Sequence, residues 1–255
     1  MVVFGKTCTG QGVTRQGPGI RSERGVMRVL ITGSNRGIGL EFVRQYLEEG
    51  WRVYATCRRP AEAESLHMLS ELHNGLSIHR LDVAIPEDIR NISRELNDVP
   101  LDLLINNAGV SLEKGSSELG HIRYYDWLRT LEVNTLGAVR VTEALLDNIS
   151  RGAKKLVAVL SSHMGDIADI REIGSYCYRS SKAALNAAMQ GMAVELKDRR
   201  IGVLLLHPGG VTTRMGPAEG IPVQKSVKGM RRIIDGFTLE QSGSFLQYDG
   251  KKMAW

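Results

Sequence analysis

Tyr178 and Lys182 offer the clearest chemistry in this sequence, because they stand four residues apart in a segment expected to be helical. Positions i and i+4 of a helix lie on the same face, one turn apart. An ammonium beside a phenol favours the phenolate and lowers the phenol's pKa from its ordinary value of about 10. The pair therefore predicts a tyrosine that exchanges protons near neutral pH. Tyr248 and Lys252 have the same spacing, but the Asp-Gly between them predicts a turn, so they need not share a face.

A glycine-rich turn offers a second chemical feature, a cradle for phosphate. Gly33, Gly37 and Gly39 have the spacing Gly-x3-Gly-x-Gly, between a predicted strand and a predicted helix. Glycines at such a turn let the backbone approach a pyrophosphate, which binds the unpaired N–H groups at the helix N-terminus. A lone glycine triplet is often only a turn, but the flanking strand and helix favour the binding interpretation.

The elements that must position these residues alternate along the chain from Met27 onward. The expected strands are Arg28–Thr32, Arg52–Thr56, Leu76–Leu81, Leu101–Ile105, Lys155–Leu160, Ile201–His207 and Ser244–Tyr248. The expected helices are Ile38–Glu49, Ala61–Leu72, one opening at Pro86, Tyr125–Ile149, one running from Tyr178 and Lys182 to about Lys197, and Gln224–Ile234. This alternation predicts an α/β fold: a doubly wound, mostly parallel, Rossmann-like sheet of about seven strands with helices on both faces. A ligand is expected at the carboxyl ends of the strands.

Composition narrows the class of protein. The 255 residues are 42% hydrophobic and 24% charged, as in an ordinary soluble protein. No run approaches the roughly 18 apolar residues of a membrane span. The net charge is +5, and no aromatic residues interleave with a basic stripe, which argues against a nucleic-acid partner. The three cysteines are widely spaced and form neither a disulfide framework nor a metal motif, which favours a reducing compartment.

Residues 1–26 differ from the rest of the chain. They are rich in Gly, Thr, Gln and Arg, lack hydrophobic periodicity and carry four basic residues against one acid. We expect a disordered leader here, followed by a single domain over residues 27–255. A cytoplasmic location is expected; a mitochondrial one is the alternative, because a basic, acid-poor leader can be a transit peptide.

Four motifs in order resemble the short-chain dehydrogenase/reductase family across residues 27–255. They are Thr32-Gly33-x3-Gly37-Ile38-Gly39, Asn106-Asn107-Ala108-Gly109, Tyr178-x3-Lys182 and Pro208-Gly209-x-Val211-x-Thr213. Within that family, the chain is most similar to the short NADPH-dependent carbonyl reductases of the sniffer and C-factor type, whose C-terminus resembles the closing residues 248–255.

The resemblance implies four catalytic residues. Ser162 would hold the substrate carbonyl oxygen, and Tyr178 would donate a proton as hydride reaches the carbon. Lys182 would lower the pKa of the tyrosine and bond the nicotinamide ribose, while Asn134 would keep a water that relays protons to Lys182. Ser162 precedes Tyr178 by sixteen residues, an interval longer than the family's common one. The charged segment Gly165–Gly174 between them is expected to be an exposed, lengthened loop that shapes substrate choice.

The cofactor is expected to be NADP(H). After the second strand the sequence reads Cys57-Arg58-Arg59, without the acid that would bind a ribose 2′-OH, and Arg36 lies in the glycine turn. Guanidiniums bind a 2′-phosphate through bidentate, charge-assisted bonds, although solvated loop charges are the alternative interpretation. By resemblance, the cofactor-binding residues are Gly33, Ser34, Asn35, Arg36, Gly37, Ile38, Arg58, Asp82, Val83, Asn107, Ala108, Gly109, Tyr178, Lys182, Pro208, Gly209, Val211 and Thr213.

The expected activity is NADPH-dependent reduction of a small aldehyde, ketone or quinone. Two alternatives stay open: a dinucleotide-binding regulatory protein without turnover, and a narrower reductase for a steroid or pterin. The expected partner is the small-molecule carbonyl substrate, with no metal, no nucleic acid and no membrane. The resemblance allows a monomer or a homodimer.

Overall fold

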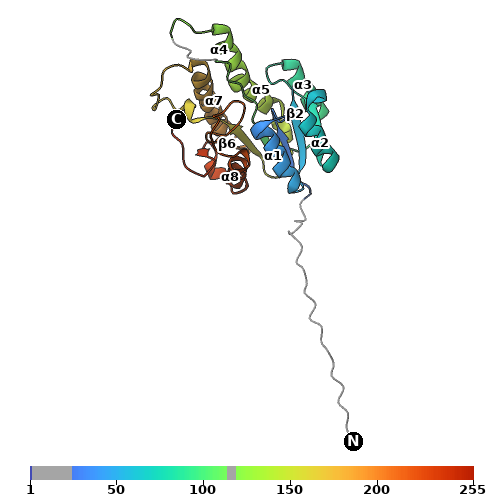
Figure 1. Cartoon of the computed structure of the whole chain (residues 1–255). Helices are drawn as coiled ribbons and strands as arrows, with labels where there is room; N and C mark the ends of the chain where they lie inside the picture. Colours follow the sequence, from blue (N-terminus) through green and yellow to red (C-terminus); the bar gives the residue numbers. More distant parts are fainter. Residues whose placement is uncertain (2–24, 114–118) are drawn as a thin grey trace.

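The computed structural model describes Met1 and residues 25–113 and 119–255 (Figure 1). The predicted leader, residues 1–26, falls almost entirely outside the described residues. Among the helices that are described, none combines the length and the apolar character that crossing a membrane would require.

The described residues form one sheet of seven strands, all parallel, in the order β3-β2-β1-β4-β5-β6-β7. The strands are β1 (Arg28–Ile31), β2 (Arg52–Cys57), β3 (Leu76–Arg80), β4 (Leu103–Asn106), β5 (Leu156–Leu160), β6 (Gly202–His207) and β7 (Phe245–Gln247). The order reverses at β1 and β4, so their carboxyl ends open a crevice where such sheets bind ligands. The predicted doubly wound fold is confirmed.

Helices cover both faces of the sheet (Figure 1). They are α1 (Gly37–Glu48), α2 (Glu64–Leu72), α3 (Pro86–Glu95), α4 (Tyr124–Leu131), α5 (Gly137–Ala144), α6 (Leu146–Arg151), α7 (Tyr176–Glu195) and α8 (Val223–Asp235). Pro86 stands at the first position of α3, as predicted, where its missing N–H leaves no helical bond unmade.

Alternate strand residues divide the core into two layers. On β1, Leu30 faces one layer with residues of α3, α5 and α7, whereas Val29 and Ile31 face the other with residues of α1, α2 and α8. Strand β5 reads Leu-Val-Ala-Val-Leu and is buried throughout, as expected of a central parallel strand covered on both faces. The rigid sheet thus fixes the loops at its carboxyl edge.

The predicted single helix Tyr125–Ile149 is wrong in one respect, because the structure interrupts it. A π-helical turn, Glu132–Leu136, separates α4 from α5, and a non-helical residue, Leu145, separates α5 from α6. Single π turns inside helices are frequent at functional sites. The sequence carries no signal for this turn, because Glu132–Leu136 contains neither the glycine nor the proline that usually marks a helix break.

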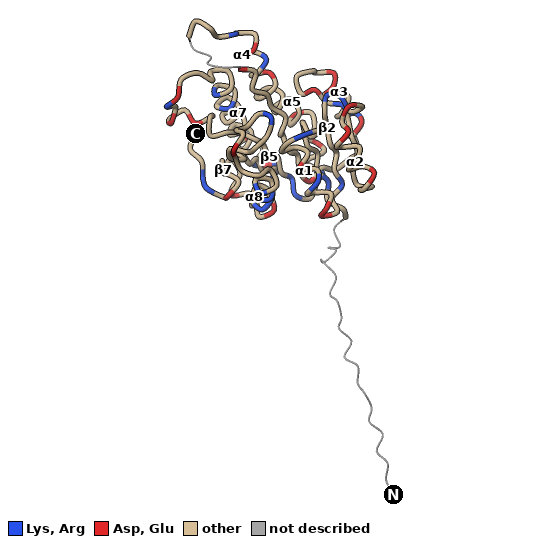
Figure 2. The backbone as a smooth tube through the Cα atoms, in the orientation of Figure 1, with Lys and Arg blue, Asp and Glu red and all other residues tan. Residues whose placement is uncertain are grey.

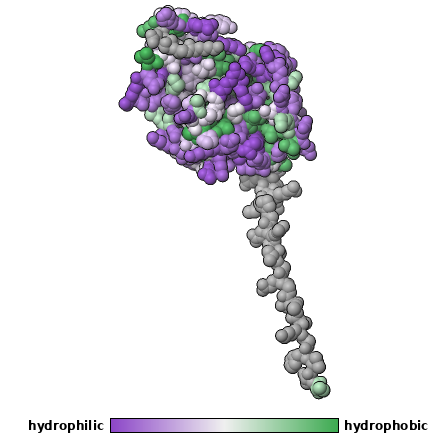
Figure 3. Space-filling model, in the orientation of Figure 1, coloured by the Kyte–Doolittle hydropathy of each residue, from purple (hydrophilic) through white to green (hydrophobic). Residues whose placement is uncertain are grey.

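The surface mixes charges of both signs. Figure 2 shows Lys and Arg interspersed with Asp and Glu over the backbone, and hydrophilic residues cover most of the face seen in Figure 3.

Candidate active site

The turn between β1 and α1 forms a narrow cradle. Gly33 and Gly37 have positive φ angles of 66° and 57°, a conformation that side chains rarely allow. A Cβ on Gly33 would lie 2.9 Å from the Cα of Ala108, and one on Gly39 would lie 2.5 Å from the Asn107 amide nitrogen. The predicted glycine turn is therefore required by close packing against the loop after β4.

The N-terminus of α1 opens into this cradle without a side-chain cap. Arg36 occupies the N-cap position in extended conformation and makes no capping bond, and the first turn contains no acid. Unpaired N–H groups at a helix N-terminus bind anions, so the predicted pyrophosphate fits here. Ser34 departs from the prediction: it is fully buried, and its hydroxyl donates to the main-chain oxygens of Ile31 and Thr56. Ser34 braces the turn and does not line the cradle.

The loop after β4 is fastened to the same turn. The Thr32 hydroxyl accepts the backbone N–H groups of Asn107 and Ala108, each at 3.0 Å. The Asn107 side chain donates to the carbonyls of Thr32 and Gly33 at 2.8 and 2.9 Å. Its amide donors are thus committed to the turn, so a contact from Asn107 to a ribose would come from its backbone.

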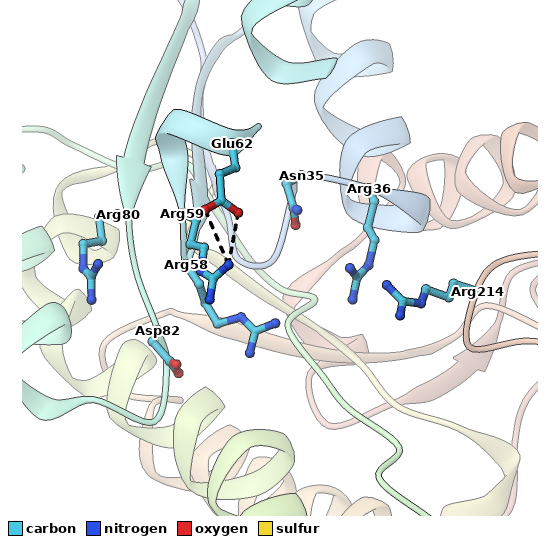
Figure 4. A pocket seen from close by; sticks show the side chains of 8 residues that line it. All are labelled: Asn35, Arg36, Arg58, Arg59, Glu62, Arg80, Asp82 and Arg214. Carbon is cyan, nitrogen blue, oxygen red and sulfur yellow. Dashed lines mark hydrogen bonds and ion pairs between the residues drawn. The ribbon is translucent and has the colours of Figure 1, made fainter. Parts of the chain in front are cut away.

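Five arginines surround a cavity of about 570 Å³ beside the cradle (Figure 4). The residues lining it are Asn35, Arg36, Arg58, Arg59, Glu62, Arg80, Asp82 and Arg214. Four of the predicted cofactor residues therefore share one space: Asn35, Arg36, Arg58 and Asp82. Such a basic cavity is suited to a phosphate group.

Asp82 and Val83 differ in their surroundings. The Asp82 carboxylate accepts the N–H of Ala84 at 3.0 Å and lies 3.6 Å from the Arg129 guanidinium. Val83 is buried and packs so closely on Gly137 of α5 that a Cβ there would lie 2.7 Å away. Asp82 is thus the polar member of the pair at the cavity, as predicted.

Tyr178 and Lys182 lie on one face of α7, with the ammonium nitrogen 5.7 Å from the centre of the tyrosine ring. Lys182 is buried, and its Nζ donates to the carbonyl of Leu160, at the end of β5, at 2.8 Å. Burial lowers the pKa of Lys182 from 10.5 to about 8. The competing pair is excluded as predicted, because Tyr248 follows β7 and lies in a turn.

The predicted lowering of the pKa of Tyr178 is wrong for this structure. Burial raises the pKa of the phenol above its ordinary value, and the nearby Ser162 hydroxyl offsets only part of the rise. Burial penalises the phenolate and the ammonium alike, so it acts against both charged partners. Tyr178 therefore keeps its proton at neutral pH.

Ser162 follows β5 and faces Tyr178. Its hydroxyl oxygen accepts the N–H of Met164 at 3.1 Å and caps the short 3-10 turn His163–Gly165. Because the oxygen accepts this bond, the hydroxyl proton remains available to a substrate oxygen. The predicted exposed loop Gly165–Gly174 is exposed over residues 167–173, whereas Gly165 and Gly174 at its ends are buried.

Asn134 lies in the π turn and is buried. Its side-chain oxygen accepts the N–H of Val110 at 2.7 Å, and its amide donates to the Val110 carbonyl at 2.8 Å and the Ser181 hydroxyl at 3.0 Å. A Cβ on Gly109 would lie 3.4 Å from this side-chain oxygen and 3.9 Å from the Lys182 nitrogen. Since protein groups occupy both polar atoms of the side chain, a water at Asn134 would bind its main chain.

The loop after β6 lies next to the glycine cradle. It begins with Pro208 and Gly209, and its buried Val211 pairs with Ile221 in a short parallel bridge. The methyl group of Thr213 lies 3.7 Å from the Cβ position of Gly37. The structure thus brings Thr213, a predicted cofactor-binding residue, to the start of α1.

Three residues of this region were not predicted from the sequence. Arg80 and Arg214 line the cavity, and Glu113 caps α7: its two carboxylate oxygens accept the N–H groups of Cys177 and Tyr178, each at 3.0 Å. Arg214 directly follows Thr213 of a recognised motif, which was the available signal. For Glu113, distant in sequence from α7, there was no signal.

Comparison with known proteins gives consistent matches. The sequence model of the family described as short chain dehydrogenase matches residues 27–220. C-signal from Myxococcus xanthus is 46% identical over 158 residues, which cover 61% of this chain and 93% of that protein. The NADPH-bound carbonyl reductase from chicken fatty liver is 32% identical, with a TM-score of 0.83 and coverage of 90% of this chain and 99% of that one. Carbonyl reductase Sniffer of D. melanogaster is 30% identical, with a TM-score of 0.84 and coverage of 91% and 100%. The resemblance read from the motifs is confirmed.

Proposed function

This chain belongs to the short-chain dehydrogenase family, and we propose that it is an NADPH-dependent reductase of a small aldehyde, ketone or quinone. One observation carries the proposal: Ser162, Tyr178 and Lys182 meet beside a glycine cradle whose neighbouring cavity is lined by arginines. The relatives described as carbonyl reductases, one of them bound to NADPH, support the same substrate class.

The residues present fit NADPH. The cradle has no room for a Cβ at Gly33 or Gly39, and the uncapped N-terminus of α1 suits a pyrophosphate. Arg36 and Arg58 would hold the 2′-phosphate, Asp82 the adenine, and the loop after β6 the nicotinamide carboxamide. Bound there, NADPH would supply the hydride.

Ser162 and Tyr178 would manage the substrate oxygen. The Ser162 hydroxyl donates to the carbonyl oxygen and orients it. As the carbon gains a hydride, the oxygen gains negative charge, and the Tyr178 phenol gives it a proton to complete the alcohol. The raised pKa of Tyr178 suits this direction, because the donor must hold its proton until the oxygen becomes basic.

Lys182 would restore the proton of Tyr178. Its pKa of about 8 lies near neutrality, where it can both release and regain a proton. A water held by the main chain of Asn134, in the π turn, would link this nitrogen to solvent.

The test is consumption of NADPH, followed by its absorbance, with a panel of aldehydes, ketones and quinones. We expect turnover by the wild type, and a loss of about 10²–10⁴-fold in Tyr178→Phe, the usual contribution of general acid catalysis. NADPH binding should be unchanged in that variant. Tyr125→Phe, on the exposed face of α4, is the matched control and should keep full activity. Turnover by Tyr178→Phe at the wild-type rate would refute the role of Tyr178, and no turnover on any carbonyl would refute the proposed activity.

A further inference from the structure

The loop after β6 contributes an arginine to the basic cavity, far in sequence from the other arginines there. Arg214 comes from this loop, Arg36 from the glycine turn and Arg58 from the end of β2. In Figure 4 the guanidiniums of Arg36 and Arg214 lie next to each other, and that of Arg58 points into the same space. Three segments that follow three different strands thus converge on one point.

The arginines of the cavity differ in their partners. Arg59 pairs with Glu62 at 3.2 Å, and Arg80 pairs with Asp88 at 3.3 Å. Within residues 25–113 and 119–255, no carboxylate lies within ion-pair distance of the other three, Arg36, Arg58 and Arg214. Neighbouring guanidiniums repel each other, and an anion placed among them would remove that repulsion.

Hydrogen bonds within the loop after β6 fix the position of Arg214. Backbone bonds from Thr212 to the Ile221 carbonyl (3.1 Å) and from Ile221 to the Gly210 carbonyl (2.7 Å) close the loop at its base. The hydroxyl of Thr213 accepts the N–H of Gly216 at 3.1 Å, which fixes the turn next to Arg214. Together with the contact between Thr213 and Gly37, these bonds hold the arginine beside the glycine turn.

We propose that Arg214 binds the 2′-phosphate of NADPH together with Arg36 and Arg58. A phosphate monoester carries about −1.5 to −2 charges at pH 7 and three acceptor oxygens, which match several guanidinium donors. The site then spans both halves of the sheet, so the 2′-phosphate fastens the loop after β6, which also carries Val211 and Thr213. The inference rests on the proposed NADPH dependence and deepens it: this loop takes part in choosing NADPH over NADH.

The experiment measures dissociation constants for NADPH and NADH by fluorescence titration of wild type, Arg214→Ala, Arg214→Lys and Arg58→Ala. We expect Arg214→Ala to weaken NADPH binding about 10-fold, the loss of one charge-assisted bond, and to leave NADH binding unchanged. Arg214→Lys should fall between wild type and Arg214→Ala, because lysine keeps the charge without the bidentate fork. Arg232→Ala, on the exposed side of α8, is the matched control and should bind both cofactors as the wild type does.

The outcomes separate this inference from the proposed function. If Arg58→Ala loses NADPH affinity and Arg214→Ala does not, the role of Arg214 is refuted and the cofactor choice stands. If Arg214→Ala weakens NADPH and NADH equally, Arg214 contacts the pyrophosphate and the inference is overturned. If the wild type binds NADH as tightly as NADPH, the proposed cofactor itself is wrong. Thermal unfolding of each variant checks that the fold is intact.

Discussion

The buried ammonium of Lys182 should make the protein less stable at neutral pH than at alkaline pH, and Lys182→Met should abolish this dependence. The folded-state pKa of Lys182 is about 8, below the ordinary 10.5. Between these values the unfolded chain binds more protons than the folded one, so the free energy of unfolding rises with pH across that window. Methionine has a similar length and no charge, so it removes the titration while it fills the space.

The magnitude follows from the pKa difference. Each unit is worth about 1.4 kcal/mol, so the shift from 10.5 to about 8 costs the folded wild type about 3 kcal/mol at pH 7. By pH 9.5 the cost falls to about 1.5 kcal/mol, because most folded molecules are then neutral at Lys182. The Leu160 carbonyl loses its donor in Lys182→Met, which costs about 1–3 kcal/mol at every pH. The difference in the free energy of unfolding between wild type and Lys182→Met should therefore change with pH.

Urea unfolding of both proteins from pH 7 to 9.5 provides the measurement. The wild type should gain about 2 kcal/mol relative to Lys182→Met over this range, and other titrating groups cancel in the comparison. Lys225→Met, on the exposed side of α8, is the control and should keep a constant difference from the wild type. A constant difference for Lys182→Met as well would show that Lys182 is not held at a lowered pKa, and the proton return assigned to it would fail.

Three further predictions concern the frame of the site. Glu113→Ala removes the cap at the N-terminus of α7, the helix of Tyr178, so it should lower the free energy of unfolding by about 1 kcal/mol and also lower kcat. The NADPH dissociation constant should stay unchanged. Steady-state kinetics and NADPH titration check this, and an unchanged kcat would contradict it. Gly39→Ala should weaken NADPH binding and destabilise the protein by about 1–3 kcal/mol, because its Cβ would lie 2.5 Å from the Asn107 amide; wild-type affinity would contradict the tight cradle. Burial lowers the pKa of His207 from 6.5 to about 4. The free energy of unfolding should therefore fall by up to about 3 kcal/mol as the pH drops from 6.5 to about 4, because only the unfolded chain takes up the proton readily. Urea unfolding of His207→Phe should not show this loss.

The sequence predicted the architecture well because the fold rests on local patterns. Continuous apolar strands alternate with amphipathic helices, and each strand of the observed sheet overlaps a predicted one. The interruption of Tyr125–Ile149 was not predictable, because the π turn Glu132–Leu136 contains no glycine or proline to mark a break. Element bounds otherwise moved by a few residues, as at β4, which begins at Leu103 instead of Leu101.

The site was predictable where its residues belong to short motifs and unpredictable where the fold joins distant segments. The spacing of Tyr178 and Lys182 was readable, because i and i+4 share a face of any helix. The direction of the pKa shift at Tyr178 was not, since it depends on burial that only the folded chain creates. Glu113 reaches the start of α7 across 64 residues, and Arg214 meets Arg36 only because their loops end at the same edge of the sheet. No local pattern contains these contacts.

Two features at the carboxyl edge of the sheet depart from good folding practice. Lys182 is an ammonium buried at a cost, and Arg36, Arg58 and Arg214 crowd together without carboxylates in the described part of the chain. Natural sequences break such rules mainly at functional sites. A dinucleotide phosphate is an anion, so it would complement the N-terminus of α1 and the three arginines. A substrate oxygen would accept the hydroxyl proton of Ser162, whose oxygen accepts the N–H of Met164. Together these features support a reductase more strongly than any one motif.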